Sequence, residues 1–154
     1  MGTQEKPYVR DAIYEDTASL APRLRAEDVT ELYYATGKTP LQVLRKSYEL
    51  SKKCWAVIYK EKVIALFGVS DAGKVGVPWM LASDELKDIK KSFLRECKDY
   101  VARMGEGHDL LTNYVWVGNE IHIQWLKWLG FTFLDPIEYG FAKKPFMQFF
   151  MKFR

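Results

Sequence analysis

The sequence predicts a mixed α/β fold (α+β), in which helices and strands alternate along one chain. Short apolar runs at 54–59, 63–69 and 110–117 lie between turn residues, as strands do. The segment 86–104 repeats its apolar residues at spacings of three and four, which is typical of a helix that buries one face. With 154 residues, 48% hydrophobic and 28% charged, the chain has enough apolar side chains for one core. We therefore expect residues 1–154 to form a single domain.

The first half of the chain begins with a strand at 7–14. A broken helix is expected from Asp16, as its N-cap, to Ala35, and Gly37 supplies the stop. The pair Thr39-Pro40 begins a second helix, because proline is well suited to the first helical turn.

A hairpin is predicted next. The apolar runs 54–59 and 63–69 are separated only by Lys60-Glu61-Lys62, a spacing that favours antiparallel pairing. A further strand at 74–81 contains Pro78, which cannot donate to a strand ladder and so belongs at a bulge or an edge.

The second half of the chain is expected to begin with the longest helix, capped by Ser83-Asp84 and ended by Gly105. The final strand carries apolar residues on both of its faces, Phe150 among them. The other predicted elements are a strand at 110–117, a helix at 121–129 stopped by Gly130, and strands at 131–134 and 146–153.

Charge and hydropathy exclude several classes of protein. The net charge of +3, from 23 Lys and Arg against 20 Asp and Glu, is too small and too dispersed for a nucleic-acid-binding surface. No run reaches the ~18 apolar residues of a membrane span, and 1–10 lacks the apolar core of a signal peptide. We expect a soluble protein in the cytoplasm where it is made.

The cysteines and histidines predict neither a disulfide scaffold nor a metal site. Cys54 and Cys97 lie in apolar stretches and are expected to be reduced, buried and inert. His108 and His122 have no further ligand at metal spacing. We expect His108 to be solvated on a turn and His122 to be polar-facing or partly buried.

The stretch VWVGNEIHIQWLKWLGF, residues 115–131, resembles the closing half of a GNAT N-acetyltransferase domain. The predicted order of elements before it matches the same family. The resemblance implies a splayed mixed sheet of about six or seven strands flanked by about four helices. It also implies that acyl-CoA would lie beside the splayed strands. Asn119 would cap the following helix, and it is the one cofactor-binding residue that the resemblance implies if CoA binds.

A narrower resemblance is to the small GNAT-like internal virion and assembly proteins of short-tailed bacteriophages, the podoviruses. The residues that carry it are NYVWVGN at 113–119, GVPW at 76–79 and WLGF at 128–131. This resemblance implies that the partners are phage virion or assembly proteins, a host protein, or a second copy of the chain. The implied location is the host cytoplasm during infection, with packaging in the virion as the other option.

The family holds the cofactor pyrophosphate on a glycine-rich turn at the start of its long helix, where backbone N–H groups attract an anion. The corresponding stretch 79–88 has no glycine, and Asp84, Glu85 and Asp88 would repel a pyrophosphate. We therefore expect no cofactor, with acetyl-CoA as the alternative.

The general acid of many family members is a tyrosine four residues before the glycine of the Gly-Phe pair. Leu126 stands at that position and cannot transfer a proton. Tyr100, Tyr114, Tyr139 and Glu120 are conceivable substitutes, and the sequence singles out none of them. The catalytic residue, if there is one, stays unknown at this stage.

The sequence is rich in aromatic residues, which favours a protein-binding surface. The interface candidates are Trp79, Trp116 and Phe150. Our first hypothesis is a phage protein that keeps the GNAT scaffold for protein binding after losing acetyl transfer. Its rival is an active acetyl-CoA-dependent N-acetyltransferase that modifies a host protein or a small amine. A third hypothesis is an antagonist of host defence that binds a bacterial protein.

Overall fold

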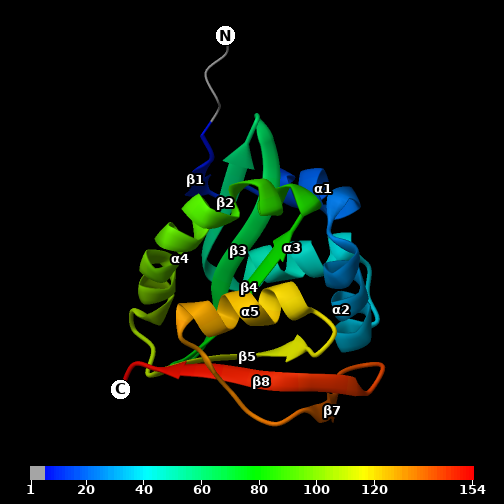
Figure 1. Cartoon of the computed structure of the whole chain (residues 1–154), viewed down its shortest axis with the longest axis vertical. Coiled ribbons are helices and arrows are strands. Elements are labelled where there is room, and N and C mark those ends of the chain that lie inside the picture. Colours follow the sequence, from blue (N-terminus) through cyan, green and yellow to red (C-terminus); the bar gives the residue numbers. More distant parts are fainter. Residues whose placement is uncertain (1–5) are drawn as a thin grey trace.

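The computed structural model describes residues 6–154, which form one mixed sheet with helices on both faces (Figure 1). The α/β class is confirmed, with eight strands and five α-helices. The helices are α1 (Glu15–Leu20), α2 (Ala26–Thr36), α3 (Pro40–Leu50), α4 (Lys90–Gly105) and α5 (Glu120–Leu129), with 3-10 segments η1 (Ala21–Arg23) and η2 (Asp84–Ile89). The strands are β1 (Tyr8–Asp11), β2 (Ser51–Tyr59), β3 (Lys62–Ala72), β4 (Val75–Ala82), β5 (Leu110–Trp116), β6 (Thr132–Phe133), β7 (Ile137–Tyr139) and β8 (Lys144–Lys152).

The sheet runs in the order β1-β2-β3-β4-β5-β8-β6, and β7 also pairs with β8. All neighbours are antiparallel except β4 and β5, which are parallel and pair only at Val75↔Leu110 and Gly76↔Leu111. Beyond Gly76 the two strands diverge, so the sheet is splayed in its middle.

Pro78 lies on the diverging part of β4. Its carbonyl accepts a hydrogen bond of 2.7 Å from the Asn113 side chain of β5. Because the N–H and C=O of a strand residue point the same way, the missing N–H of Pro78 faces the splay and costs no ladder bond. Pro78 therefore lies at an edge, as predicted. This edge is the side of β4 that faces the gap between β4 and β5.

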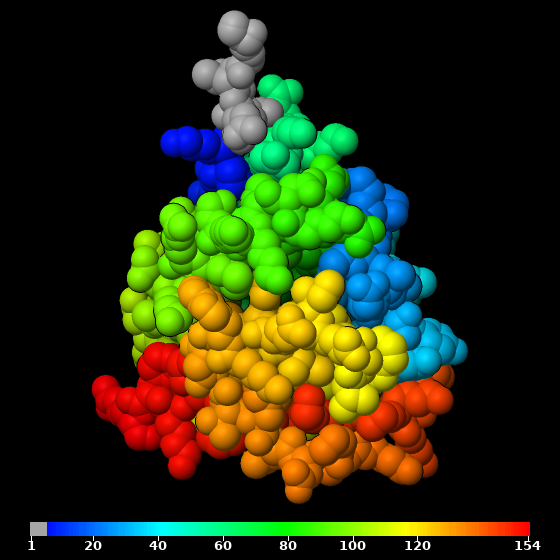
Figure 2. Space-filling model, viewed as in Figure 1, coloured from blue at the N-terminus to red at the C-terminus, as the bar shows by residue number. Residues whose placement is uncertain are grey.

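Two hydrophobic clusters lie on the two faces of the sheet. α4 and α5 cover one face, where Phe93, Trp125 and Phe149 belong to the larger cluster. η2, α4 and α5 form the surface on this side (Figure 2). α1, α2 and α3 cover the other face over a smaller cluster that includes Leu20 and Leu44.

The predicted boundaries in the first half are mostly confirmed. Gly37 ends α2 in the left-handed region at φ 70°, and Thr39 begins α3 with a capping box. Asp16 is not the predicted N-cap, because Tyr14 takes that position. Its buried carboxylate instead accepts hydrogen bonds from the Ile13 N–H and the Arg10 guanidinium, both at 2.8 Å.

The hairpin between β2 and β3 is confirmed, with a turn of two residues rather than three. Lys60 and Glu61 have φ of 51° and 64°, the backbone that tight hairpin turns favour because it matches the twist of the strands.

The long helix begins later than the sequence predicts. Ser83 precedes the 3-10 segment η2, makes no side-chain cap, and has a buried hydroxyl without a partner. Leu86 and Ile89 are nevertheless buried as predicted. Residues three apart lie on one face of a 3-10 helix as well as of an α-helix, so the apolar pattern did not distinguish the two.

Strand β7 was not predicted, and it consists of only three residues directly after Pro136. It pairs with β8, which lies between β5 on one side and β6 and β7 on the other. Both faces of β8 carry a buried aromatic residue: Phe149 belongs to the larger hydrophobic cluster, and Phe146, three residues earlier, points to the opposite face.

No helix within residues 6–154 is both long and apolar enough to cross a membrane. Residues 1–5, part of the stretch considered for a signal peptide, lie outside the described residues.

Candidate functional site: the cavity at the splayed strands

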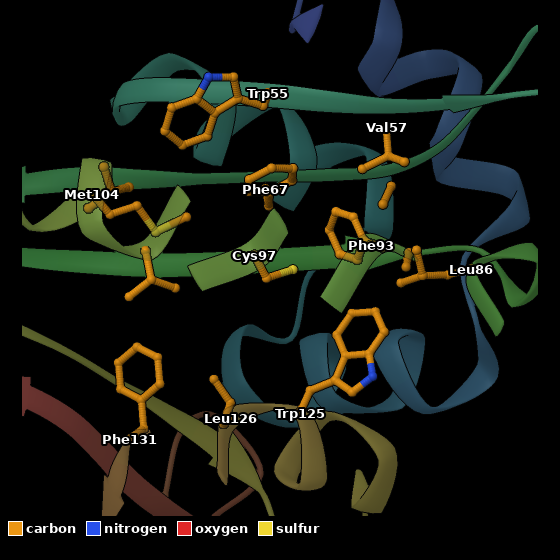
Figure 3. Packing of buried hydrophobic residues seen from close by; sticks show 14 of the residues in the cluster. Trp55, Val57, Phe67, Leu86, Phe93, Cys97, Met104, Trp125, Leu126 and Phe131 are labelled. Carbon is orange, nitrogen blue, oxygen red and sulfur yellow. The ribbon is translucent and has the colours of Figure 1, made fainter. Parts of the chain in front are cut away.

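A cavity of about 270 Å³ lies where β4 and β5 diverge. We call it the splay cavity. Its lining comes from both faces of the sheet and is mostly apolar. One wall is formed by α2 and α3, and the other by α4 and α5 (Figure 3 shows part of the second wall). The polar groups that line it include those of Glu31, Asn113, Tyr114, His122 and Tyr139.

Glu31 is the most perturbed acid of this cavity. Its carboxylate accepts hydrogen bonds from the Trp116 N–H at 3.0 Å and from the Asn119 side chain at 3.3 Å. Removal from water raises the pKa of Glu31 to about 7, and the nearby Asp28 carboxylate adds to the rise. The hydrogen bonds and Arg25 oppose it.

Asp28 lies one helical turn before Glu31 and is only 1% exposed. Its carboxylate accepts from Arg25 at 2.6 Å, from the Ala82 N–H at 3.0 Å and from Asn119 at 3.1 Å. A buried carboxylate with three donors is well compensated for its lost hydration.

These two acids connect α2 to both arms of the splay at its wide end. Ala82 is the last residue of β4, and Trp116 is the last residue of β5. Asp28 binds the N–H of the first and Glu31 binds the N–H of the second. α2 therefore supplies the hydrogen-bond acceptors that the diverging strands no longer supply to each other.

Asn119 occupies the N-cap position of α5 but makes no side-chain cap, contrary to the prediction. Its side chain is fully buried and turns toward α2, where the amide bonds Asp28 and Glu31 and the carbonyl oxygen accepts from Arg25 at 3.1 Å. The side chain that the GNAT resemblance assigned to CoA is thus occupied by contacts within the protein.

Three of the four conceivable proton donors line the splay cavity, namely Tyr100, Tyr114 and Tyr139. The rings of Tyr114 and Tyr139 stack with centroids 4.0 Å apart. Burial raises the pKa of Tyr139, and Tyr114 raises it further. Leu126 also lines the cavity, whereas Glu120 is exposed and lies outside the lining.

Acetyl-CoA, the cofactor that the GNAT resemblance implies, would lie beside the splayed strands. On the side of α4 and α5 the wall of the splay cavity is largely aromatic (Figure 3). The rings of Phe93 and Trp125 are 5.5 Å apart, and both side chains are buried together with Leu126.

The start of α4 has no glycine-rich turn that could bind the pyrophosphate of the cofactor. The glycine-free stretch forms η2, whose first turn contains Asp84 and Glu85. These acids precede α4 rather than lying in its first turn as predicted; that turn begins with Lys90 and Lys91. The residues present therefore include no glycine-rich turn that could bind the pyrophosphate of the cofactor.

Both histidines are at least partly removed from solvent. His108 is 3% exposed, not solvated as predicted, because its ring bonds the Met104 carbonyl at 2.7 Å and the Asp71 carboxylate at 2.5 Å. This contact lowers the pKa of Asp71. His122 is half-buried, as expected, and lines the splay cavity, where burial lowers its pKa.

The thiols are free, and only one is fully buried. Cys97 is buried and Cys54 is half-buried, and removal from water raises the pKa of each to about 12. At neutral pH neither is a thiolate nucleophile. Among residues 6–154, no group of three or more His, Cys, Asp or Glu could hold a metal ion.

The three interface candidates are half-buried. Trp79 lines the splay cavity and donates its indole N–H to Ser51 at 2.8 Å. Trp116 packs edge to face on Tyr34 at 5.2 Å. Phe150 lies on β8 opposite Thr112.

Asp28 and Glu31 were missed by reasoning from the sequence. A signal for them exists, because they lie three residues apart on the helical face that also carries the buried Leu32. Acidic residues on the apolar face of a helix indicate buried hydrogen-bond acceptors.

Several solved acetyltransferases have the same fold. The acetyltransferase of Bacillus subtilis in complex with CoA superposes with a TM-score of 0.64 at 8% identity, covering 98% of this chain and 100% of that one. The aminoglycoside acetyltransferase AAC(6')-Ib in complex with ribostamycin and coenzyme A gives a TM-score of 0.68 at 13% identity, covering 96% of this chain and 93% of that one. A GNAT-family acetyltransferase of Streptococcus pneumoniae gives a TM-score of 0.66 at 11% identity, covering 96% of this chain and 99% of that one. The predicted GNAT fold is confirmed, and at these identities the likeness concerns the fold alone.

Sequence similarity points to a phage protein. The "Probable scaffold protein gp13" of Escherichia phage T7 is 39% identical over 59 residues, 36% of this chain and 43% of that protein. This chain therefore matches less than half the length of that relative. The family described as "Bacteriophage T7, probable scaffold protein Gp13" matches residues 53–139. Because this match covers more than half of the 154 residues, the chain belongs to that family.

Proposed function

We propose that this protein acts in bacteriophage assembly, as a single GNAT-fold domain that binds other proteins and transfers no acetyl group. One observation carries the proposal: in a chain of a phage scaffold-protein family, the segment η2 before α4 has no glycine and begins with Asp84 and Glu85, so it offers no anion-binding turn for a cofactor pyrophosphate. The printed name of the T7 relative, a probable scaffold protein, supports the role in assembly.

The hydrogen-bond network of Asp28, Glu31 and Asn119 beside the splay cavity is explained by this role without any reaction. Asp28 and Glu31 hold the ends of β4 and β5, and Asn119 joins both acids to the turn before α5. Such a network fixes the two arms of the sheet and leaves the outer surface for partners. Those partners are other phage virion or assembly proteins, or a host protein, met in the infected cell. Packaging in the virion is part of the proposal.

The second candidate function is acetyl-CoA-dependent N-acetyl transfer. The observation that favours it is Glu31, a carboxylate with a pKa of about 7 in a cavity shared with Tyr114 and Tyr139. A group that titrates near neutral pH is suited to proton transfer. The same carboxylate is already engaged by two hydrogen bonds, which favours the structural role.

Calorimetric titration with acetyl-CoA and with CoA separates the two candidates. We expect no binding tighter than about 1 mM, which corresponds to roughly 4 kcal/mol of affinity. AAC(6')-Ib, which forms a complex with coenzyme A, serves as the positive control. A micromolar dissociation constant would overturn the claim that the fold has lost its cofactor.

The role in assembly is tested in infected cells. The protein should cosediment with procapsids or virions, and a phage in which its gene is interrupted should form fewer mature particles. Comparing procapsids with mature virions distinguishes a component that leaves from one that is packaged. Absence from both fractions, together with normal particle yield, would refute a role in assembly.

A further inference from the structure

Two of the three most exposed aromatic side chains of residues 6–154 lie where the C-terminal end of α2 meets the turn between β7 and β8. Phe141 is 63% exposed and Tyr33 is 52% exposed. Their rings lie edge to face with centroids 5.7 Å apart. In Figure 2 the end of α2 in light blue and this turn in orange lie side by side at the lower right.

This aromatic pair is held in place by the backbone beneath it. The Phe141 N–H donates to the Ala35 carbonyl at 3.1 Å, and the Ala142 N–H donates to the Tyr34 carbonyl at 2.9 Å. A Cβ at Gly37 would lie 2.9 Å from the Phe141 ring, so the close approach requires glycine there. Aromatic side chains on a fixed backbone lose little entropy when they bind a partner.

Three exposed lysines and one exposed acid, Glu138, lie close to the pair in the chain, so positive charge predominates there. Lys38, Lys143 and Lys144 are exposed beside it, and the stretches 32–39 and 139–144 contain no Asp or Glu. The Lys144 ammonium lies 5.4 Å from the Tyr34 ring. None of the three lysines forms an ion pair with another described residue. We call this surface, made of Tyr33, Phe141, Lys38, Lys143 and Lys144, the basic aromatic patch.

We propose that the basic aromatic patch binds an acidic segment of a partner protein, which places one aromatic or aliphatic side chain against Phe141 and Tyr33. Exposed rings supply the apolar anchor of the interface, and the lysines at its rim select negative charge and speed association. The proposal rests on the proposed function, since it names the chemistry of the partner.

A protein segment fits this patch better than a nucleic acid does. Three lysines release few counterions, so they contribute little to binding a polyanion. The two rings are set at 69° to each other, which offers no row of parallel platforms for stacked bases.

The test measures peptide binding to the full chain by fluorescence anisotropy. The probe is a labelled peptide of Glu and Asp residues with a central Phe-Leu pair. The comparison probes are the same peptide with Lys in place of the acids, and a single-stranded oligonucleotide of equal charge. We expect the acidic peptide to bind about ten-fold more tightly than the basic one, and binding to weaken as salt rises.

Matched variants locate the site. Phe141→Ser and the double variant Lys143→Glu, Lys144→Glu should each weaken binding of the acidic peptide about ten-fold. Leu134→Ser, at a similarly exposed apolar position, and Lys91→Glu on α4 should leave it unchanged. Circular dichroism verifies folding, and Tyr33→Ser replaces Phe141→Ser if the latter fails to fold.

Several outcomes overturn the proposal: equal binding of both peptides, stronger binding of the oligonucleotide, or no effect of the patch variants. Self-association that is lost in Phe141→Ser, without peptide binding, would assign the patch to a second copy instead. If the peptide binds as expected but phage assembly does not need the protein, the proposed function fails while the patch stands. If the acidic peptide does not bind but phage assembly needs the protein, the proposed binding role of the patch fails while the proposed function stands.

Discussion

Glu31 and Asp28 show how a single side chain can replace a missing strand partner. Each accepts the N–H of a terminal strand residue, Trp116 in the first case and Ala82 in the second. The two acids differ in their surroundings, because Asp28 faces Arg25 at 2.6 Å, whereas Glu31 has only neutral donors within hydrogen-bond reach. The ionised form of Glu31 is therefore the more costly of the two.

Glu31→Gln should reduce the dependence of stability on pH. The pKa of Glu31 is about 7 in the folded protein against an ordinary value of 4.5. Below pH 4.5 the carboxyl group is protonated in the folded and in the unfolded protein. As pH rises from 4.5 to 7, its contribution to the free energy of unfolding falls, and above pH 7 it stays constant. The loss is up to about 3 kcal/mol, taking 1.36 kcal/mol per unit of pKa. Glutamine keeps the acceptor without the charge, so the variant should be the more stable protein at pH 8.

Urea unfolding of both proteins at pH 5 and pH 8 measures this difference. Glu49→Gln, an exposed position on α3, is the matched control. The same loss of stability between the two pH values in wild type and in Glu31→Gln would contradict the interpretation.

At the level of elements, α5 is the helix on which the cofactor side of the splay depends. Its inner face places Ile123, Trp125 and Leu126 in the larger core cluster, while Trp128 is 46% exposed. Gly130 ends it in the left-handed region at φ 102° and directs the chain back into Phe131. Trp125 and Leu126 thus belong to the core and also to the wall of the splay cavity.

Trp125→Ala should lower the free energy of unfolding by roughly 3 to 5 kcal/mol, because it removes a large buried side chain and leaves a cavity. Trp128→Ala, on the exposed face of the same helix, is the control and should cost far less. Thermal and urea unfolding measure both. An equal loss of unfolding free energy in the two variants would show that α5 does not pack on the sheet through the face that carries Trp125.

At the scale of the whole molecule, β3 and β4 join the two clusters. In β3, Phe67 points into the larger cluster and Leu66 into the smaller one, and in β4 Ala82 and Leu81 divide in the same way. The β5 and β8 half of the sheet is attached to this centre through two residue pairs with β4, through α2, and through the helices of the α4 face. Shared strands couple the packing of both faces, which is why we propose one domain.

The chain should accordingly unfold in one cooperative transition. Tryptophan fluorescence reports mainly the core on the α4 face, and far-ultraviolet circular dichroism reports all helices and strands. The two urea curves should coincide, as expected for a single domain of this size. Two separate transitions would show that the halves of the splayed sheet fold independently.

The sequence by itself determined most of the elements and their order. Gly37, the Thr39-Pro40 start and Gly130 act through local backbone preferences, and short apolar runs between turn residues identified β2, β3 and β5. The motif at 115–131 added the GNAT fold. Local signals failed where two structures share one pattern, as with η2, or where an element is too short to have a pattern, as with β7.

Only the tertiary structure decided the candidate site. Asp28 and Glu31 are ordinary helix residues until the packing of α2 across the splay turns them toward Ala82 and Trp116. In the same way His108 is buried and hydrogen-bonded to Asp71, which is distant in sequence. The basic aromatic patch depends on the return of the β7–β8 turn to α2. Hydrogen bonds and desolvation between residues far apart in the chain set these properties, and periodicity within one element contains no information about them.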